Sequence, residues 1–228
     1  TVFYTVINIV LVNLVGFCLA LLATSNLRLR NFYRAGFFVP NLIGGIVLGY
    51  IWQFMFNNVF VSFAAKLGIS FMSKSMLSSP KLVIWAMSIV NTWQYGGYIM
   101  MIYVAGIQGI HAELMEAASV DGANYGMRLR KILIPMLSNS FTICLFLTLI
   151  NSFKQYDLNF SLTTGGPAAL FMGKAIRSSE LLAMNIYNTA NLNNELAIGQ
   201  AKAVVFFLIL VVVSLVQVSF NKRREVEL

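Results

Sequence analysis

Five long apolar runs occupy most of this chain, over residues 1–23, 32–56, 82–108, 135–153 and 203–220. Each run is long enough for an α-helix to cross a hydrocarbon core of about 30 Å. A backbone in lipid has no water to bond, so only helices and closed barrels can span a membrane. The short alternating segments of a barrel are not visible here. The sequence therefore predicts an all-α, polytopic transmembrane bundle with five visible spans.

Composition favours the same interpretation over a soluble fold. Hydrophobic residues make up 58% of the chain and charged residues 11%, whereas an ordinary soluble domain has about 25% charged residues. The runs are apolar all round, while helices of a soluble protein usually keep a polar face. We therefore expect residues 1–228 to form one transmembrane domain. Cys18 and Cys144 lie in separate spans and are expected to be packing residues, and no metal site is predicted.

The basic residues predict the orientation, because Lys and Arg concentrate in short cytoplasmic loops. Three clusters alternate correctly to share the cytoplasmic side: Arg28, Arg30 and Arg34; Arg128, Arg130 and Lys131; and Lys222, Arg223 and Arg224. Segments 57–81 and 154–202 then lie outside, as does Thr1. An odd number of spans suggests a preceding one, with six in the full protein. The formal charge of +8 is read as topology and anionic-lipid contact, with no nucleic-acid partner.

Residues 111–134 are the most informative loop and read as two short helices joined by a turn. Leu114, Ala117 and Ala118 form a small apolar face on the first helix. Asp121-Gly122 is a turn pair, since Gly adopts positive φ without a Cβ penalty. Asn124 is expected to cap the second helix. Pro135 is expected to bias Ile134 away from helical geometry and to bend the chain before the next span.

This loop resembles the E-A-A, three residues, G, nine residues, I-x-L-P pattern of permeases in binding-protein-dependent ABC importers. The matching residues are Glu116, Ala117, Ala118, Gly122, Ile132 and Pro135, with Ile134 where Leu is usual. Residues 156–158 (YDL), 162–167 (LTTGGP) and 199–203 (GQAKA) resemble the carbohydrate-type branch. The resemblance implies the permease subunit of an ATP-driven sugar or oligosaccharide importer, multi-pass in the bacterial cytoplasmic membrane, with a type I importer fold.

The resemblance also implies roles and partners. In the family this loop couples to a cytoplasmic ATPase, with Glu116 as a polar anchor, Ala117 and Ala118 for close approach, and Asp121 and Gly122 for the turn. Expected partners are that ATPase, a second permease subunit forming a heterodimer, and an extracytoplasmic sugar-binding protein. This chain is expected to bind no cofactor, since Gly173-Lys174 is followed by Ala175 and does not complete a phosphate loop. ATP and Mg would be bound by the partner ATPase. No catalytic residue is expected, and His111 is read as a surface or interfacial residue.

A sugar pathway needs amides to bond hydroxyl groups and aromatic faces to pack against the rings. The candidates are Asn91, Trp93, Gln94, Asn151 and Tyr156. The competing interpretation is that the amides bond neighbouring helices and the aromatic rings anchor at the interface.

Three alternatives to a sugar permease remain. A permease of the same superfamily could import another solute. A self-contained secondary carrier should place carboxylates within the membrane, and none of the five runs contains Asp or Glu. A membrane enzyme would need His, Asp or Glu clustered at one depth, which the sequence does not show.

Overall fold

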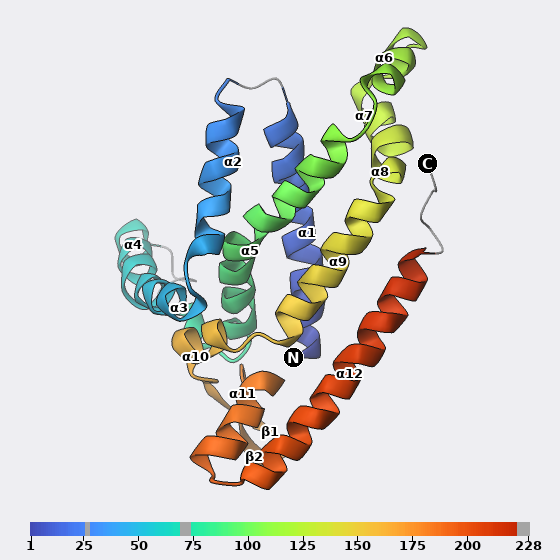
Figure 1. Cartoon of the computed structure of the whole chain (residues 1–228). Coiled ribbons are helices and arrows are strands. Elements are labelled where there is room, and N and C mark those ends of the chain that lie inside the picture. Colours follow the sequence, from blue (N-terminus) through green and yellow to red (C-terminus); the bar gives the residue numbers. More distant parts are fainter. Residues whose placement is uncertain (26–27, 69–73, 223–228) are drawn as a thin grey trace.

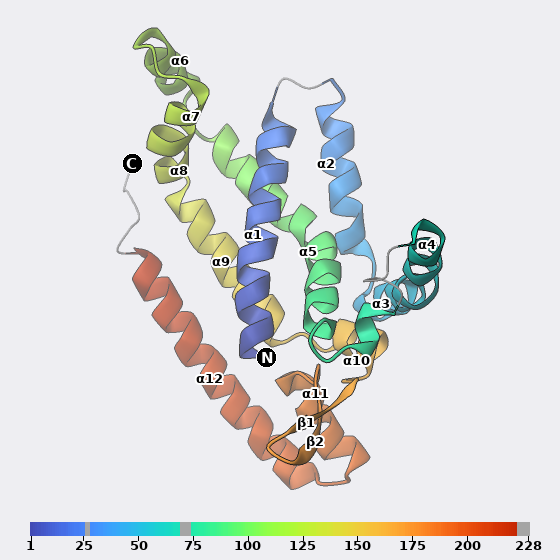
Figure 2. The ribbon, with the colours of Figure 1, turned by 180° about the vertical axis from the view of Figure 1, so that it is seen from behind.

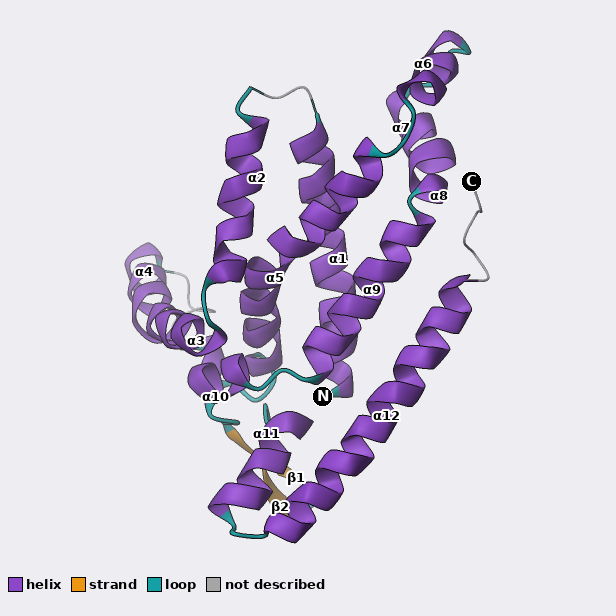
Figure 3. Ribbon diagram, in the orientation of Figure 1, coloured by secondary structure: helices purple, strands orange, loops and turns teal. Residues whose placement is uncertain are grey.

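The computed structural model describes residues 1–25, 28–68 and 74–222. Its architecture is a bundle of long helices with one small hairpin (Figures 1 and 3). The longest helices are α1 (Val2–Thr24), α5 (Val83–Gln108), α9 (Ser138–Phe153) and α12 (Leu196–Lys222). Of the C-terminal basic cluster, Arg223 and Arg224 lie outside the described residues.

The core of the bundle is the contact among α1, α5 and α9 (Figure 2). At Gly16 the backbones approach closely, since a Cβ there would lie 3.2 Å from the carbonyl oxygen of Gly96. Polar side chains tie the same helices together: Asn13 donates to Thr148 at 3.2 Å, and Tyr103 donates to Asn13 at 3.0 Å. Small residues and interhelical hydrogen bonds are how helices associate where there is no water to exclude.

The second apolar run is not the single helix predicted over 32–56. It divides into α2 (Arg30–Phe38), the 3₁₀ turn η1 (Val39–Leu42) and α3 (Gly45–Phe54). The π turn η2 (Met55–Val59) and α4 (Phe60–Leu67) then carry the helix beyond the predicted end. Pro40 lies in η1, and Gly44 has extended backbone at φ −59° and ψ 138°. Proline lacks an N–H and glycine is a weak helix former, so the break falls between them.

The loop after α5 forms α6 (Ala112–Val120), α7 (Tyr125–Arg128), the π turn η5 (Leu129–Leu133) and α8 (Ile134–Met136). The predicted bend at Ile134 is wrong, because that residue is helical at φ −62° and ψ −46°. Its N–H bonds the carbonyl of Leu129, five residues earlier. Such a widened turn makes room ahead of Pro135. The 68° bend comes later, between Met136 and Ser138.

Segment 154–202 holds more structure than a loop. It contains α10 (Asp157–Thr163), α11 (Leu182–Tyr187) and the π turn η6 (Asn188–Leu192), and α12 begins at Leu196 rather than at 203. The strands β1 (Ala168–Phe171) and β2 (Lys174–Arg177) pair antiparallel, with Ala168 opposite Arg177. The all-α prediction therefore missed one hairpin, whose turn uses positive φ at Met172 (50°) and Gly173 (76°). A separate 3₁₀ turn, η4 (Met76–Ser78), precedes α5.

Within the described ranges, three helices are long and apolar enough to span a membrane: Val2–Thr24, Gly45–Leu67 and Leu196–Ser219. The number rises to five when each of two bent pairs is taken as one span. These pairs are Val83–Gln108 with Ala112–Val120, and Tyr125–Met136 with Ser138–Phe153.

Candidate functional site

The turn between α6 and α7 has a fixed geometry that follows from two residues. Gly122 has φ +81°, a conformation open to glycine at no steric cost. The N–H of Ala123 bonds the carbonyl of Ala118 at 2.9 Å, and that of Gly122 bonds Ser119 at 3.1 Å, which is the Schellman pattern. The side chain of Asn124 accepts from the Met127 N–H at 2.9 Å and caps α7, as predicted from the sequence. Hydrogen bonds therefore fix both the end of α6 and the start of α7, on either side of the turn.

This helix pair is open to its surroundings. No residue of α6 or α7 is buried, and both views place α6 at one end of the molecule, far from the hairpin (Figures 1 and 2). Glu116, Ala117, Asp121, Gly122 and Pro135 are exposed, while Ala118 and Ile132 are half-buried. Val120 is 88% exposed and Leu114 is 45% exposed. Exposed apolar side chains on an element that projects from the fold are typical of a surface that binds a partner.

A polar pocket of about 260 Å³ lies where η1, α3, α5 and the α9–α10 connection meet. Its lining residues, together called the polar pocket below, are Asn41, Gly45, Gln94, Tyr95, Asn151, Lys154, Gln155, Tyr156 and Asp157. Three of the five pathway candidates, Gln94, Asn151 and Tyr156, come together here. Sequence reasoning missed Asn41, Gly45 and Lys154 as lining residues. The Pro40–Gly45 break was the available signal, since a broken helix within a membrane indicates backbone lining a cavity.

The three pathway candidates in the polar pocket differ in the contacts that their side chains make. The Gln94 amide donates to the main-chain carbonyl of Ile43 at 2.9 Å, beside the helix break. The Asn151 side-chain oxygen is buried and has no hydrogen-bond partner among the residues that the structure describes. The Tyr156 ring stacks on Phe160 at a centroid distance of 5.7 Å. Burial raises the pKa of Tyr156 above the ordinary value of a phenol. A tyrosine hydroxyl is protonated at neutral pH in either case and can donate a hydrogen bond. The pocket thus offers a donor, an unpaired acceptor and an aromatic face.

The other two pathway candidates lie elsewhere. Asn91 is buried, donates to Asn8 at 2.8 Å and accepts from Gln155 at 3.2 Å, so its hydrogen bonds join α5 to α1 and to the α9–α10 connection. Trp93 is 45% exposed and packs edge-to-face on Trp52 at 5.5 Å, outside the polar pocket. For these two residues the structure favours the helix-packing interpretation.

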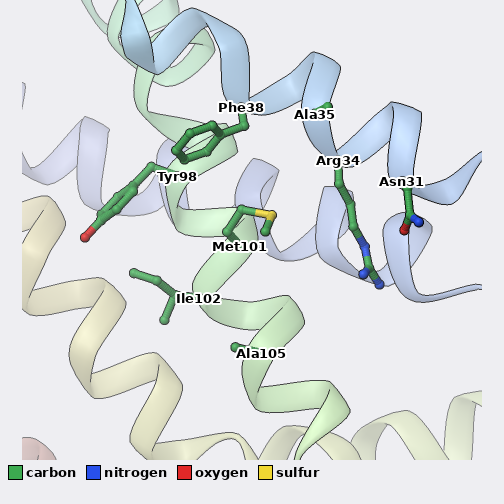
Figure 4. Close-up of a pocket in the computed structure, with 8 residues that line it drawn as sticks. All are labelled: Asn31, Arg34, Ala35, Phe38, Tyr98, Met101, Ile102 and Ala105. Carbon is green, nitrogen blue, oxygen red and sulfur yellow. The ribbon is translucent and has the colours of Figure 1, made fainter.

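A second and larger hollow, of about 630 Å³, lies between α2 and α5 (Figure 4). Its lining residues, together called the apolar groove below, are Asn31, Arg34, Ala35, Phe38, Tyr98, Met101, Ile102 and Ala105. Two guanidinium nitrogens of Arg34 donate to the carbonyl of Ala23, at 2.9 and 3.2 Å, and so cap the end of α1. Among the residues that the structure describes, no three His, Cys, Asp or Glu side chains are grouped as metal ligands.

Comparison with known proteins agrees with this architecture. The family model described as "Binding-protein-dependent transport system inner membrane component" matches residues 13–226. A relative named "Probable starch degradation products transport system permease protein AmyD", from Thermoanaerobacterium thermosulfurigenes, is 42% identical over 225 residues, covering 99% of this chain and 74% of the relative. A "Multiple sugar-binding transport system permease protein MsmF" from Streptococcus mutans is 28% identical, covering 92% of this chain and 70% of the relative.

The fold has a counterpart among solved structures. A chain of a "bacterial alginate ABC transporter in complex with alginate pentasaccharide-bound periplasmic protein" superposes with a TM-score of 0.81 at 16% identity, covering 97% of this chain and 76% of that one. The helical transmembrane bundle predicted from the apolar runs is thereby confirmed as the fold. The chain belongs to the family of inner membrane components of binding-protein-dependent transport systems.

Proposed function

We propose that this chain forms one side of the translocation pathway of an ATP-driven sugar or oligosaccharide importer. The observation that carries the proposal is the exposed α6–α7 pair, set at a fixed angle by Gly122 at φ +81°. In this proposal α6, α7 and η5 dock in a groove of a cytoplasmic ATPase, with Glu116 as the polar anchor. The ATPase binds ATP and Mg, and this chain binds neither.

The connectivity explains how such docking would act on the pathway. Helix α6 follows α5 directly, and α7, η5 and α8 lead into α9. Gln94 on α5 and Asn151 on α9 both line the polar pocket. A displacement of the loop by ATPase closure would therefore move two walls of that pocket. Rigid elements with two arrangements are the physical means of such coupling.

The pocket chemistry supports a sugar as the substrate. Amide side chains bond hydroxyl groups in pairs, and the Tyr156 ring offers a flat apolar face. Lys154 and Asp157 bring opposite charges to the same pocket, which suits a neutral polyhydroxylated solute. The 42% identical relative is named for starch degradation products, so α-linked glucose oligosaccharides are the first substrates to test.

The same proposal defines the partners and the location. A second permease would complete the pathway as a heterodimer, and an extracytoplasmic sugar-binding protein would deliver substrate to the face that carries α10 and the hairpin. The similar alginate transporter is described in complex with a substrate-loaded periplasmic protein. The membrane would be the bacterial cytoplasmic membrane, with α6 on the inside.

Uptake in a reconstituted system tests the proposal. The permease pair, ATPase and binding protein would be assembled in liposomes, with a glycan panel offered outside and ATP inside. We expect ATP-dependent accumulation of at least one oligosaccharide, and none when the binding protein is omitted. Uptake that persists without ATP or without the binding protein would contradict the proposal and favour a secondary carrier.

A further inference from the structure

A chain of hydrogen bonds between side-chain amides leads from helix α1 to the polar pocket. Asn91 on α5 donates to the side-chain oxygen of Asn8 on α1 at 2.8 Å. Gln155, in the connection between α9 and α10, donates to the side-chain oxygen of Asn91 at 3.2 Å. Asn8 and Asn91 are buried, whereas Gln155 is half-buried and lines the polar pocket. The chain therefore links Asn8, which does not line the pocket, to a residue in the pocket wall.

The direction of these hydrogen bonds is fixed at the α1 end. The side-chain nitrogen of Asn8 donates to the main-chain carbonyl of Tyr4 at 2.8 Å and to the Ser88 hydroxyl at 3.3 Å. A carbonyl can only accept a hydrogen bond, so the Asn8 nitrogen must face Tyr4 and its oxygen must face Asn91. Asn91 must then present its nitrogen to Asn8 and its oxygen to Gln155. Each amide thereby sets the orientation of the next one.

We infer that Asn8 is a positioning residue for the sugar pathway, which acts through Asn91 to hold the Gln155 amide with its oxygen toward the polar pocket. The inference rests on the proposed function. The nitrogen and the oxygen of an amide point in different directions from one carbon, so a nitrogen held against Asn91 leaves the oxygen to accept from a substrate. A sugar hydroxyl can donate that hydrogen bond, and a group that only accepts cannot.

Gln155 depends on this restraint because it belongs to no helix. It lies between Phe153, where α9 ends, and Asp157, where α10 begins. An unrestrained amide can turn over and exchange its donor for its acceptor, so it would serve substrates of either kind. With Asn91 held by Asn8, a turned Gln155 would bring two oxygens face to face beside buried groups, which is unfavourable.

Transport of deoxyfluoro sugars tests the inference in the reconstituted importer. The probes are an α-1,4-linked glucose trisaccharide and its analogues in which fluorine, which cannot donate, replaces one hydroxyl at a time. For at least one analogue, the parent should show a kcat/KM of uptake about three- to tenfold below that of the trisaccharide, as for one lost hydrogen bond. In Asn8→Leu the ratio should fall to within about twofold, because the released Gln155 amide can turn its N–H toward the fluorine. The same binding protein serves every variant, so its own preference cancels in the comparison.

Asn13→Leu is the matched control on the same helix. Asn13 is also a buried amide on α1, and its side chain bonds Thr148 on α9 and Tyr103 on α5. Neither of these partners lines the polar pocket. Asn13→Leu should therefore destabilise the bundle much as Asn8→Leu does, and it should leave the preference for hydroxyl over fluorine unchanged.

Two further substitutions at Asn8 separate positioning from packing. Asn8→Asp should keep the preference, because a carboxyl oxygen can accept from Asn91 in either protonation state. Asn8→Ser should lose the preference with less disturbance of the core than Asn8→Leu, because its short hydroxyl bonds the carbonyl of Tyr4 within α1 and does not reach Asn91.

Three results would overturn the inference. They are a parent ratio below about twofold for every analogue, parental ratios in Asn8→Ser together with any assembled Asn8→Leu, and an equal loss of preference in Asn13→Leu. Each of these leaves the proposed function standing, whereas a parent complex that imports no sugar refutes the proposed function itself.

Discussion

The side-chain amide of Gln94 donates a hydrogen bond of 2.9 Å to the main-chain carbonyl of Ile43, at the break between η1 and α3. A side chain of the third apolar run thus satisfies a backbone group that the broken second run leaves free. This contact joins the helix break to the wall of the polar pocket, and it gives Gln94 a structural role besides its proposed role in the pathway.

Gln94 and its neighbour Trp93 are expected to respond differently to truncation. Gln94→Ala removes the bond to Ile43 and a pocket amide, so uptake should fall and the protein should lose about 0.5–1.5 kcal/mol of stability. Trp93→Ala removes the edge-to-face contact with Trp52 and a half-buried indole, so the protein should lose more stability than in Gln94→Ala, while uptake should remain. Uptake kinetics and thermal unfolding in detergent measure both effects. A larger uptake defect in Trp93→Ala than in Gln94→Ala would count against the pocket as the pathway.

Close packing of α5 against α2 predicts a strong effect at one glycine. A Cβ at Gly97 would overlap the carbonyl group of Phe37, which is backbone and cannot swing away. Gly97→Ala should therefore destabilise the bundle by about 1–3 kcal/mol or more through overpacking. Gly36→Ala on α2 is the matched control, because nothing lies within 4 Å of its added Cβ. Equal melting temperatures for the two variants would refute this packing.

The buried amides Asn8 and Asn91 should be energetically coupled. Asn91 donates to the Asn8 side-chain oxygen at 2.8 Å. Removing one side chain leaves the other without this hydrogen bond, although Asn8 still bonds Tyr4 and Asn91 still bonds Gln155. The summed destabilisation of Asn8→Leu and Asn91→Leu should therefore exceed that of the double variant. A double-mutant cycle should give a coupling of about 0.6–1.7 kcal/mol, as for hydrogen bonds within membranes. A coupling near zero would show that the bond contributes no stability.

Two sites report the orientation directly. Met172, at the hairpin turn, is 90% exposed and Val120, at the end of α6, is 88% exposed. In a variant without Cys18 and Cys144, Met172→Cys should react with a membrane-impermeant thiol reagent added outside, and Val120→Cys only after access from the cytoplasm. The opposite labelling would reverse the predicted topology and place α6 away from any cytoplasmic ATPase.

The sequence was sufficient to predict the helical bundle and the turn at Gly122. It was not sufficient for features that depend on tertiary contacts. Uniform apolarity indicates that a run lies in lipid. The presence of Pro40 and Gly44 did not predict how sharply the chain changes direction between them. Asn91 and Gln94 are three positions apart and lie only about 60° from each other around an ideal helix, so helix period alone does not distinguish them. The packing of neighbouring elements does: Asn91 is buried against Asn8, and Gln94 reaches the pocket. The hairpin of β1 and β2 depends on positive φ at Met172, which residue preferences do not predict.

Docking of the α6–α7 pair to an ATPase is the central claim, and Gly122 tests it most directly. Its φ of +81° makes Gly122→Val cost roughly 1–2 kcal/mol of backbone strain. Nothing lies within 4 Å of the added Cβ, so the fold itself should persist. Gly126→Ala is the matched control, since that glycine lies in α7 and its Cβ would meet only an ordinary contact at 3.7 Å. Glu116→Lys adds a reversed charge at the proposed anchor.

The measurement is co-purification of the ATPase with each membrane-inserted variant, together with ATP hydrolysis stimulated by the loaded binding protein. The account predicts that Gly122→Val and Glu116→Lys insert normally but lose ATPase association or stimulated hydrolysis, while Gly126→Ala retains both. Wild-type association and stimulated hydrolysis in Gly122→Val and Glu116→Lys would contradict the coupling role of this loop.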